Sequence, residues 1–193
     1  MARTGGSIIV VQEPISKSLA GSLLIAHPGL LDPNFRRTVL MITDHNQEGS
    51  LGLVLNRPTG RTLGEMLPNK PIGALAQLPV LLGGPVQSNQ LIFASFRWLA
   101  ETDRMECRHH LLIPEAQEAL EQEFTEVRAF IGYAGWTGGQ IEAELAEKSW
   151  LVSRPVRDLL TAEKQDGLWK EVTSSFGPWF RLVADAPEEL RWN

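Results

Sequence analysis

The sequence predicts an α+β fold in a single domain, and three observations support this expectation. Short segments rich in Leu, Ile and Val, each bounded by Gly, Pro, Asn or Asp, dominate the first half of the chain. Amphipathic helical patterns are concentrated in the second half, without the strict alternation expected of a doubly wound sheet. The 193 residues suffice for one substantial core, and no repeat or Gly/Ser linker divides them, so residues 1–193 are expected to form one domain.

The predicted strands are short and lie mainly in the first half of the chain. Several are continuously apolar rather than alternating, as expected for a sheet that is covered on both faces. They are residues 23–26, 38–43, 51–55, 79–84 and 90–96, with a further strand at 126–136.

The clearest helical pattern is IPEAQEALEQEF at residues 113–124. Pro114 suits the first helical position, and Ala116, Ala119, Leu120 and Phe124 form an apolar stripe opposite a row of glutamates. This pattern predicts a helix that lies on a sheet. Shorter helical candidates are residues 62–67, 155–160 and 166–175.

Composition narrows the classes of partner. The chain carries 23 acidic and 18 basic residues, and its net charge of -5 repels nucleic-acid phosphates, so no direct nucleic-acid binding is expected. No uncharged stretch is a credible membrane span, and Glu13 and Lys17 interrupt the apolar run near the N-terminus, so neither a membrane partner nor a secretory leader is expected. The single cysteine, Cys107, fits a reducing compartment, and we expect a cytoplasmic protein.

Several motifs follow one another in a specific order. Gly-x-Leu-Leu-Ile-Ala begins at Gly21, Asp-Pro-x-Phe-Arg spans residues 32–36, an apolar strand closes on His45, and Gly-x-x-Leu-Asn-Arg-Pro spans residues 52–58. GGPV at 83–86 and GYAGWTGGQIEAEL at 132–145, with Trp150 beyond it, come next. Over roughly residues 19–185 this order resembles the AlgH/YqgE family, and residues 1–18 are left as an N-terminal extension.

The resemblance implies a cytosolic α+β domain built on a curved, partly barrel-like sheet flanked by helices. It implies no activity. The family's old label of transcriptional regulator does not agree with the acidic net charge or with the lack of a helix-turn-helix or zinc-finger pattern. The family strand after GGPV usually ends in Leu-His, whereas this chain has Ser95 and Phe96 there, so chemistry that depends on that histidine is not open to it.

Residues 132–139 contain four glycines and raise the question of an anion cradle. They lack the lysine of a Walker loop and do not fit Gly-x-Gly-x-x-Gly. Thr137 and Gln140 have capping-box spacing, which predicts a helix from Gly138 with Glu144 paired to Lys148. One interpretation is that the loop binds an anion through the N–H groups of Gly135, Trp136, Gly138 and Gly139, with Arg36 or Arg57 supplying the positive charge.

The other interpretation is that the loop is a tight structural corner in which Tyr133 and Trp136 provide buried area. We favour the structural corner over the anion site.

The remaining candidate ligand-binding residues lie in the earlier motifs, and each has a structural alternative. Asp32 fits a turn that caps backbone donors, and Asn56 could satisfy loop backbone groups. Arg36 and Arg57 suit a phosphate or carboxylate, but also an internal salt bridge. His45 could act as a general base or be a hydrogen-bonded turn residue.

No cofactor, metal ligand set or catalytic residue is predicted. The histidines lack the His-Glu-x-x-His spacing of a zinc site. If residues 107–109 form a strand, Cys107 and His109 share a face, which could lower the pKa of the thiol.

Three functions are compatible with these patterns. The first is a non-enzymatic regulatory or binding domain for a small anionic ligand or a protein partner. The second is a hydrolase or transferase for a phosphorylated or carboxylated metabolite, with His45 as general base. The third is an interaction module without a ligand, in which the motifs are architectural.

Overall fold

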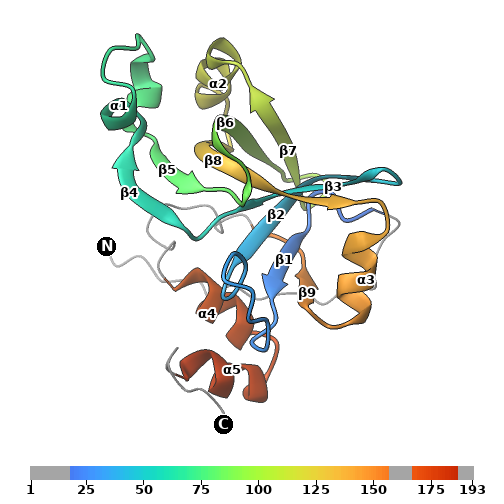
Figure 1. Cartoon of the computed structure of the whole chain (residues 1–193). Coiled ribbons are helices and arrows are strands. Elements are labelled where there is room, and N and C mark those ends of the chain that lie inside the picture. The colour runs from blue at the N-terminus through green and yellow to red at the C-terminus, as the bar shows by residue number, and fades with distance from the viewer. Residues whose placement is uncertain (1–17, 157–166, 187–193) are drawn as a thin grey trace, which may run out of the picture.

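The computed structural model describes residues 18–156 and 167–186, which form a curled mixed sheet with helices around it (Figure 1). The strands are β1 (Leu23–Ala26), β2 (Val39–Asn46), β3 (Gly49–Val54), β4 (Pro58–Thr62), β5 (Pro79–Leu82), β6 (Val86–Leu99), β7 (Arg104–Leu111), β8 (Thr125–Thr137) and β9 (Trp150–Ser153). The helices are α1 (Leu63–Met66), the 3-10 turn η1 (Gly73–Gln77), α2 (Ile113–Leu120), α3 (Gln140–Ala146), α4 (Leu168–Ser174) and α5 (Pro178–Asp185).

The sheet runs in the order β4-β5-β8-β3-β2-β1-β9, and β6 pairs with both β7 and β8. Its pairs are antiparallel except for β5 with β8, which are parallel. The mixed sheet curls into a half-barrel, which confirms the predicted α+β class (Figure 1).

Strand β8 joins the two halves of the sheet. Its first part pairs with β5 and β6, and its last part, from Ala134 to Thr137, pairs with β3. Gly132 lies between the residues of β8 that pair with β5 and those that pair with β3. Its φ is +69, and an added Cβ would lie 2.5 Å from the Gly84 carbonyl oxygen and 2.7 Å from that of Val86. The strand can change partners here because glycine permits both the left-handed backbone and the close approach.

The apolar core has two clusters that the curled sheet separates. The larger one contains the apolar strand β1 and the apolar first half of β2 together with residues of α3, α4 and β9. The smaller one lies beneath α1, η1 and α2 and includes Phe93, Ala116 and Ala119. Ala116 and Ala119 are buried, which confirms that the stripe on α2 faces the sheet.

The structure corrects several predicted boundaries. Helix α2 ends at Leu120 rather than at residue 124, because residues 121–124 turn the chain into β8. Phe124 was predicted to belong to the apolar stripe of this helix, but it lies in the turn and is exposed. Strand β6 is longer than residues 90–96, and β5 ends at Leu82 rather than at residue 84. The candidates at 62–67 and 166–175 correspond to α1 and α4, whereas most of the candidate at 155–160 lies outside the described residues.

None of the helices in residues 18–156 and 167–186 has the length and hydropathy needed to cross a membrane.

Candidate functional site

The loop before β2 is organised by Asp32. Its Oδ1 accepts a hydrogen bond from the Asn34 N–H at 2.7 Å, and its carbonyl oxygen accepts from the N–H groups of Phe35 and Arg36 at 3.0 and 2.7 Å. The turn predicted at Asp32 is therefore present. It exposes Arg36 and directs Phe35 toward the core, where its ring packs against Trp136 and Trp150.

Asn56 binds the other end of this loop. Its Oδ1 accepts from the Val39 N–H, and its Nδ2 donates to the Arg37 carbonyl oxygen, both at 2.9 Å. Both ends of the amide are therefore engaged by backbone, as the structural alternative for Asn56 expects.

Arg57 lies across the same loop and next to Arg36. Its Nη2 donates to the carbonyl oxygens of Pro33 at 3.1 Å and Arg36 at 3.3 Å. Burial lowers the pKa of Arg57, the charge of Arg36 lowers it further, and Asp32 acts in the opposite direction. Neither guanidinium is ion-paired within the part of the chain that the structure describes. The charge of Arg36 therefore acts on Arg57, and the carboxylate of Asp32 offsets part of this effect.

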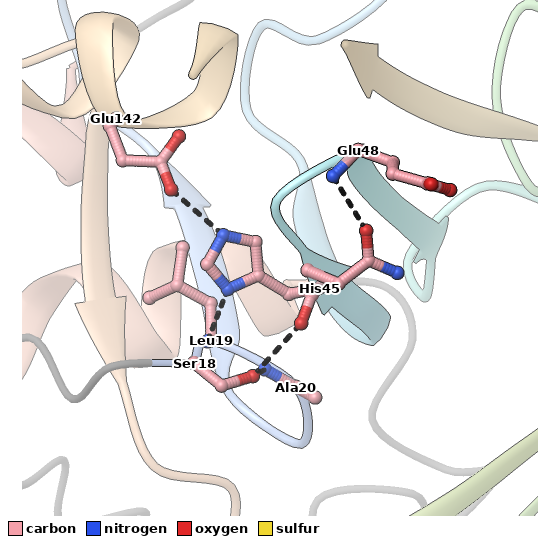
Figure 2. A network of polar contacts seen from close by, with 7 residues as sticks. Ser18, Leu19, Ala20, His45, Glu48 and Glu142 are labelled. Atoms are coloured by element: carbon pink, nitrogen blue, oxygen red, sulfur yellow. Dashed lines mark hydrogen bonds and ion pairs between the residues drawn. The ribbon is translucent and has the colours of Figure 1, made fainter. Parts of the chain in front are cut away.

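His45 lies at the opposite end of β2 and is held on both sides (Figure 2). Its Nδ1 accepts from the Leu19 N–H at 2.8 Å, so Nε2 carries the proton that is shared with Glu142 Oε1 at 2.8 Å. His45 lies six positions after Val39 along β2, a distance of about 20 Å at ~3.3 Å per residue. The structure therefore does not bring His45 to the arginines, and both of its ring nitrogens are engaged.

The glycine-rich corner differs from the predicted cap. Gln140 Oε1 accepts from the N–H and Oγ of Thr137 at 3.1 and 3.2 Å, but Thr137 still belongs to β8 and helix α3 begins at Gln140 rather than at Gly138. Gly139 is the N-cap residue with φ +79, a backbone conformation that threonine adopts only with strain. Gly138 approaches Gln47 so closely that an added Cβ would lie 2.3 Å from its carbonyl oxygen.

Trp136 of this segment and Trp150 beyond it form a clamp around Glu144. Its Oε2 accepts from the indole N–H groups of Trp136 at 3.0 Å and Trp150 at 2.8 Å, and its Oε1 accepts from Gln140 Nε2 at 3.0 Å. Both indoles are buried. The predicted pair of Glu144 with Lys148 is wrong, because α3 ends at Ala146 and Lys148 lies beyond it with φ +60.

A surface hollow of about 480 Å³ lies beside the corner. Gly135, Trp136, Thr137 and Gln140 line one side of it, and the hairpin of β2 and β3 supplies the other. Its described lining includes the carboxylates of Asp44 and Glu48 but no lysine or arginine. Negative charge at this hollow disfavours an anion, so the corner and the arginine pair are separate features.

Two further sequence expectations concern metal and thiol chemistry. Across residues 18–156 and 167–186, no three His, Cys, Asp or Glu side chains are grouped so that they could hold a metal ion. Burial, with a contribution from Glu106, raises the pKa of Cys107 to about 12. The expectation that His109 would lower this pKa is therefore wrong, because desolvation of the thiolate dominates.

We predict that Cys107 reacts slowly with thiol reagents. At pH 8 a thiol with a pKa of about 12 is ionised on the order of 1,000-fold less than an ordinary cysteine. Alkylation by iodoacetamide at pH 8 should therefore be slower by at least this factor in the folded protein than in urea. Equal rates in the two conditions would show that the thiol is not desolvated.

Comparison with known proteins agrees with this arrangement of motifs. A model of a family described as AlgH-like matches residues 23–181. The chain belongs to the AlgH-like family. Relatives named UPF0301 protein include one from Chlorobium luteolum, 35% identical over 88% of this chain and 92% of its own length, and one from Thioalkalivibrio sulfidiphilus, 32% identical over 88% and 95%.

Solved structures of AlgH-like form are similar as well. The AlgH protein of Pseudomonas aeruginosa matches with a TM-score of 0.63 and 26% identity, over 92% of this chain and 98% of that one. A protein of Corynebacterium diphtheriae matches with a TM-score of 0.66 at 19% identity, over 91% and 95%, and shows the fold alone. The family match covers Asp32, Arg36, Asn56 and Arg57 as well as the clamp around Glu144.

Proposed function

We propose that this AlgH-like protein is a non-enzymatic binding domain that takes the phosphate or carboxylate group of a small anionic ligand between Arg36 and Arg57. The observation that carries the proposal is that the Arg57 guanidinium lies 3.3 Å from the Arg36 carbonyl oxygen, within the field of the Arg36 charge, while neither arginine is ion-paired within residues 18–156 and 167–186. Like charges repel, and the lowered pKa of Arg57 reflects this repulsion as well as burial. An anion between the two groups would remove the repulsion and gain charge-assisted hydrogen bonds.

The two arginines would contribute differently. Arg57 is half-buried and fixed by the carbonyl oxygens of Pro33 and Arg36, so it supplies a pre-positioned charge with N–H groups left over on Nε and Nη1. Arg36 is exposed and offers its whole guanidinium fork, which suits the paired oxygens of a carboxylate or phosphate. Asp32 offsets part of the charge, which favours a small anion over a densely charged polymer. Nucleic acid is accordingly not proposed as a ligand.

Binding is favoured over catalysis because of the position of His45. The alternative of a hydrolase or transferase requires a base beside the bound anion. His45, the sequence candidate for that base, is bonded to Leu19 and Glu142 at the far end of β2. Any regulatory role of this protein would then depend on ligand binding and not on turnover of the ligand.

We predict that inorganic phosphate raises the melting temperature of the wild-type protein and that Arg36→Gln weakens phosphate binding about tenfold, the loss expected for one charge-assisted hydrogen bond. Binding is measured by calorimetry at constant ionic strength, with sodium chloride in place of phosphate as the blank. Arg104→Gln removes an exposed arginine on β7 and serves as the charge-matched control. Equal phosphate affinity in wild type, Arg36→Gln and Arg104→Gln, or no phosphate binding in wild type, would sink the proposal.

A further inference from the structure

A second hollow, of about 580 Å³, lies between two turns on the β6–β7 side of the sheet. The turn at residues 99–104 joins β6 to β7, and the turn at residues 121–124 joins α2 to β8. Apolar groups of Trp98, Leu99 and Phe124 line the hollow together with the charged Arg97, Glu101 and Glu123. None of these residues belongs to the arginine site or to the clamp around Glu144.

Phe124 has an exposure and a backbone conformation that are both unfavourable for stability. The residue is 57% exposed, and its φ of +57° is in the left-handed region, which is unfavourable for a bulky side chain. Its carbonyl oxygen accepts from the Trp98 N–H at 3.0 Å, which ties the two turns together. Strained backbone conformations cluster at functional sites, so a strained residue with an exposed aromatic ring points to a binding role.

The surroundings of the hollow are strongly acidic. Residues 97–104 and 121–126 contain five acidic side chains against two basic ones, and all seven are exposed. The acidic residues are Glu101, Asp103, Glu121, Glu123 and Glu126. An apolar centre with a charged rim is the usual anatomy of a protein-binding surface, in which a buried anchor supplies affinity and the rim steers the approach.

We propose that this hollow binds a basic segment of another protein, with an aromatic or aliphatic side chain seated against Trp98 and Phe124 and flanking Lys or Arg residues over the acidic rim. The negative charge disfavours anionic lipid and nucleic acid as occupants. The inference does not depend on anion binding at Arg36 and Arg57.

The probes are three fluorescent nine-residue peptides. The first has a central Leu-Phe flanked by Lys and Arg, the second carries Glu at the basic positions, and the third carries Ser in place of Leu-Phe. Fluorescence anisotropy should show that the first peptide binds and that the other two bind at least tenfold more weakly. Raising the salt concentration from 50 to 500 mM should weaken binding of the first peptide at least tenfold, on the order expected when salt screens the charges. In ¹⁵N spectra the first peptide should shift the Trp98 indole N–H and the amides of residues 99–102 and 122–124.

Phe124→Gly separates a binding role from a structural one. Glycine relieves the left-handed backbone, whereas the loss of the ring and the freer unfolded chain oppose this gain, so the variant should melt close to the wild-type temperature and yet bind the first peptide at least tenfold more weakly. Lys148→Gly is the matched control, because Lys148 has φ +60 and lies outside the hollow, so it should also melt close to the wild-type temperature and keep peptide binding. Binding unchanged in Phe124→Gly, no preference for the first peptide, or shifts confined to other parts of the chain would overturn the proposal.

Discussion

Replacing Gly132 with alanine is expected to lower the free energy of unfolding by about 3 kcal/mol or more, the combined cost of a left-handed alanine and an overpacked contact. The new Cβ would lie 2.5 Å from the Gly84 carbonyl oxygen and 2.7 Å from that of Val86, and both partners are backbone atoms that cannot move aside as a side chain would. Because Gly132 marks the place where β8 changes partners, the strain should affect both halves of the sheet. Urea unfolding measures the loss.

Gly139→Ala is the control for this substitution. Gly139 also has a positive φ, of +79, but an added Cβ would have nothing within 4 Å of it. Gly139→Ala should therefore lower the unfolding free energy by about 1 kcal/mol, the cost of a left-handed alanine alone. Equal losses in the two variants would show that the close approach of β8 to residues 84–86 contributes nothing to stability.

Replacing Glu144 with alanine is expected to cost about 3 kcal/mol of unfolding free energy, because the buried indole N–H groups of Trp136 and Trp150 would lose the carboxylate that accepts from both. Glu144→Gln keeps one acceptor oxygen of similar size and should cost about half as much. Urea unfolding and the near-ultraviolet circular dichroism of the tryptophans measure these effects.

The control on the same segment is Glu147→Ala. Glu147 is exposed at the end of α3, so its removal should change stability by less than about 0.5 kcal/mol. If Glu144→Ala and Glu147→Ala lowered the unfolding free energy equally, the hydrogen bonds from Trp136 and Trp150 to Glu144 would contribute nothing to stability.

The sequence predicts the buried part of the fold better than its edges. Strand β1 and the first half of β2 are continuous apolar runs, and both faces of such strands must be covered, so composition alone indicates them. Strand β7, RMECRHHL, alternates charged and other residues on a strand whose pairing in the described sheet is with β6 alone. Charge on an edge strand prevents aggregation, but it also removes the apolar signal, so β7 was not predicted.

The structure brings part of the candidate set together and separates the rest, and ligand binding by these residues stays a prediction. Asp32, Arg36, Asn56 and Arg57 do meet, because the turn at Asp32 and the end of β3 flank the same end of β2. His45 closes β2 at its other end, and the length of the strand separates it from residues that precede the strand. Strand direction, which motif matching ignores, decides which of these residues can act together.

The role of Glu144 could not be read from spacing along the helix. A glutamate four residues before a lysine indicates an exposed pair, and that rule presumes that the helix continues to the lysine. Here the helix ends at Ala146, and the nearby indole N–H groups of Trp136 and Trp150 reach the carboxylate from two strands, β8 and β9. A buried indole N–H requires an acceptor, so the presence of Trp136 and Trp150 was the feature of the sequence that could have indicated this contact.

The central claim is that an anion binds between Arg36 and Arg57 and not at the glycine-rich corner. Titration of ¹⁵N-labelled protein with inorganic phosphate, with the arginine Nε–H and backbone amide resonances recorded together, tests it most directly. We expect saturable shifts of the Nε–H signals of both arginines with one common dissociation constant, and unchanged amides at Gly138, Gly139 and Gln140. Saturable shifts at those three amides with silent arginine signals would contradict it.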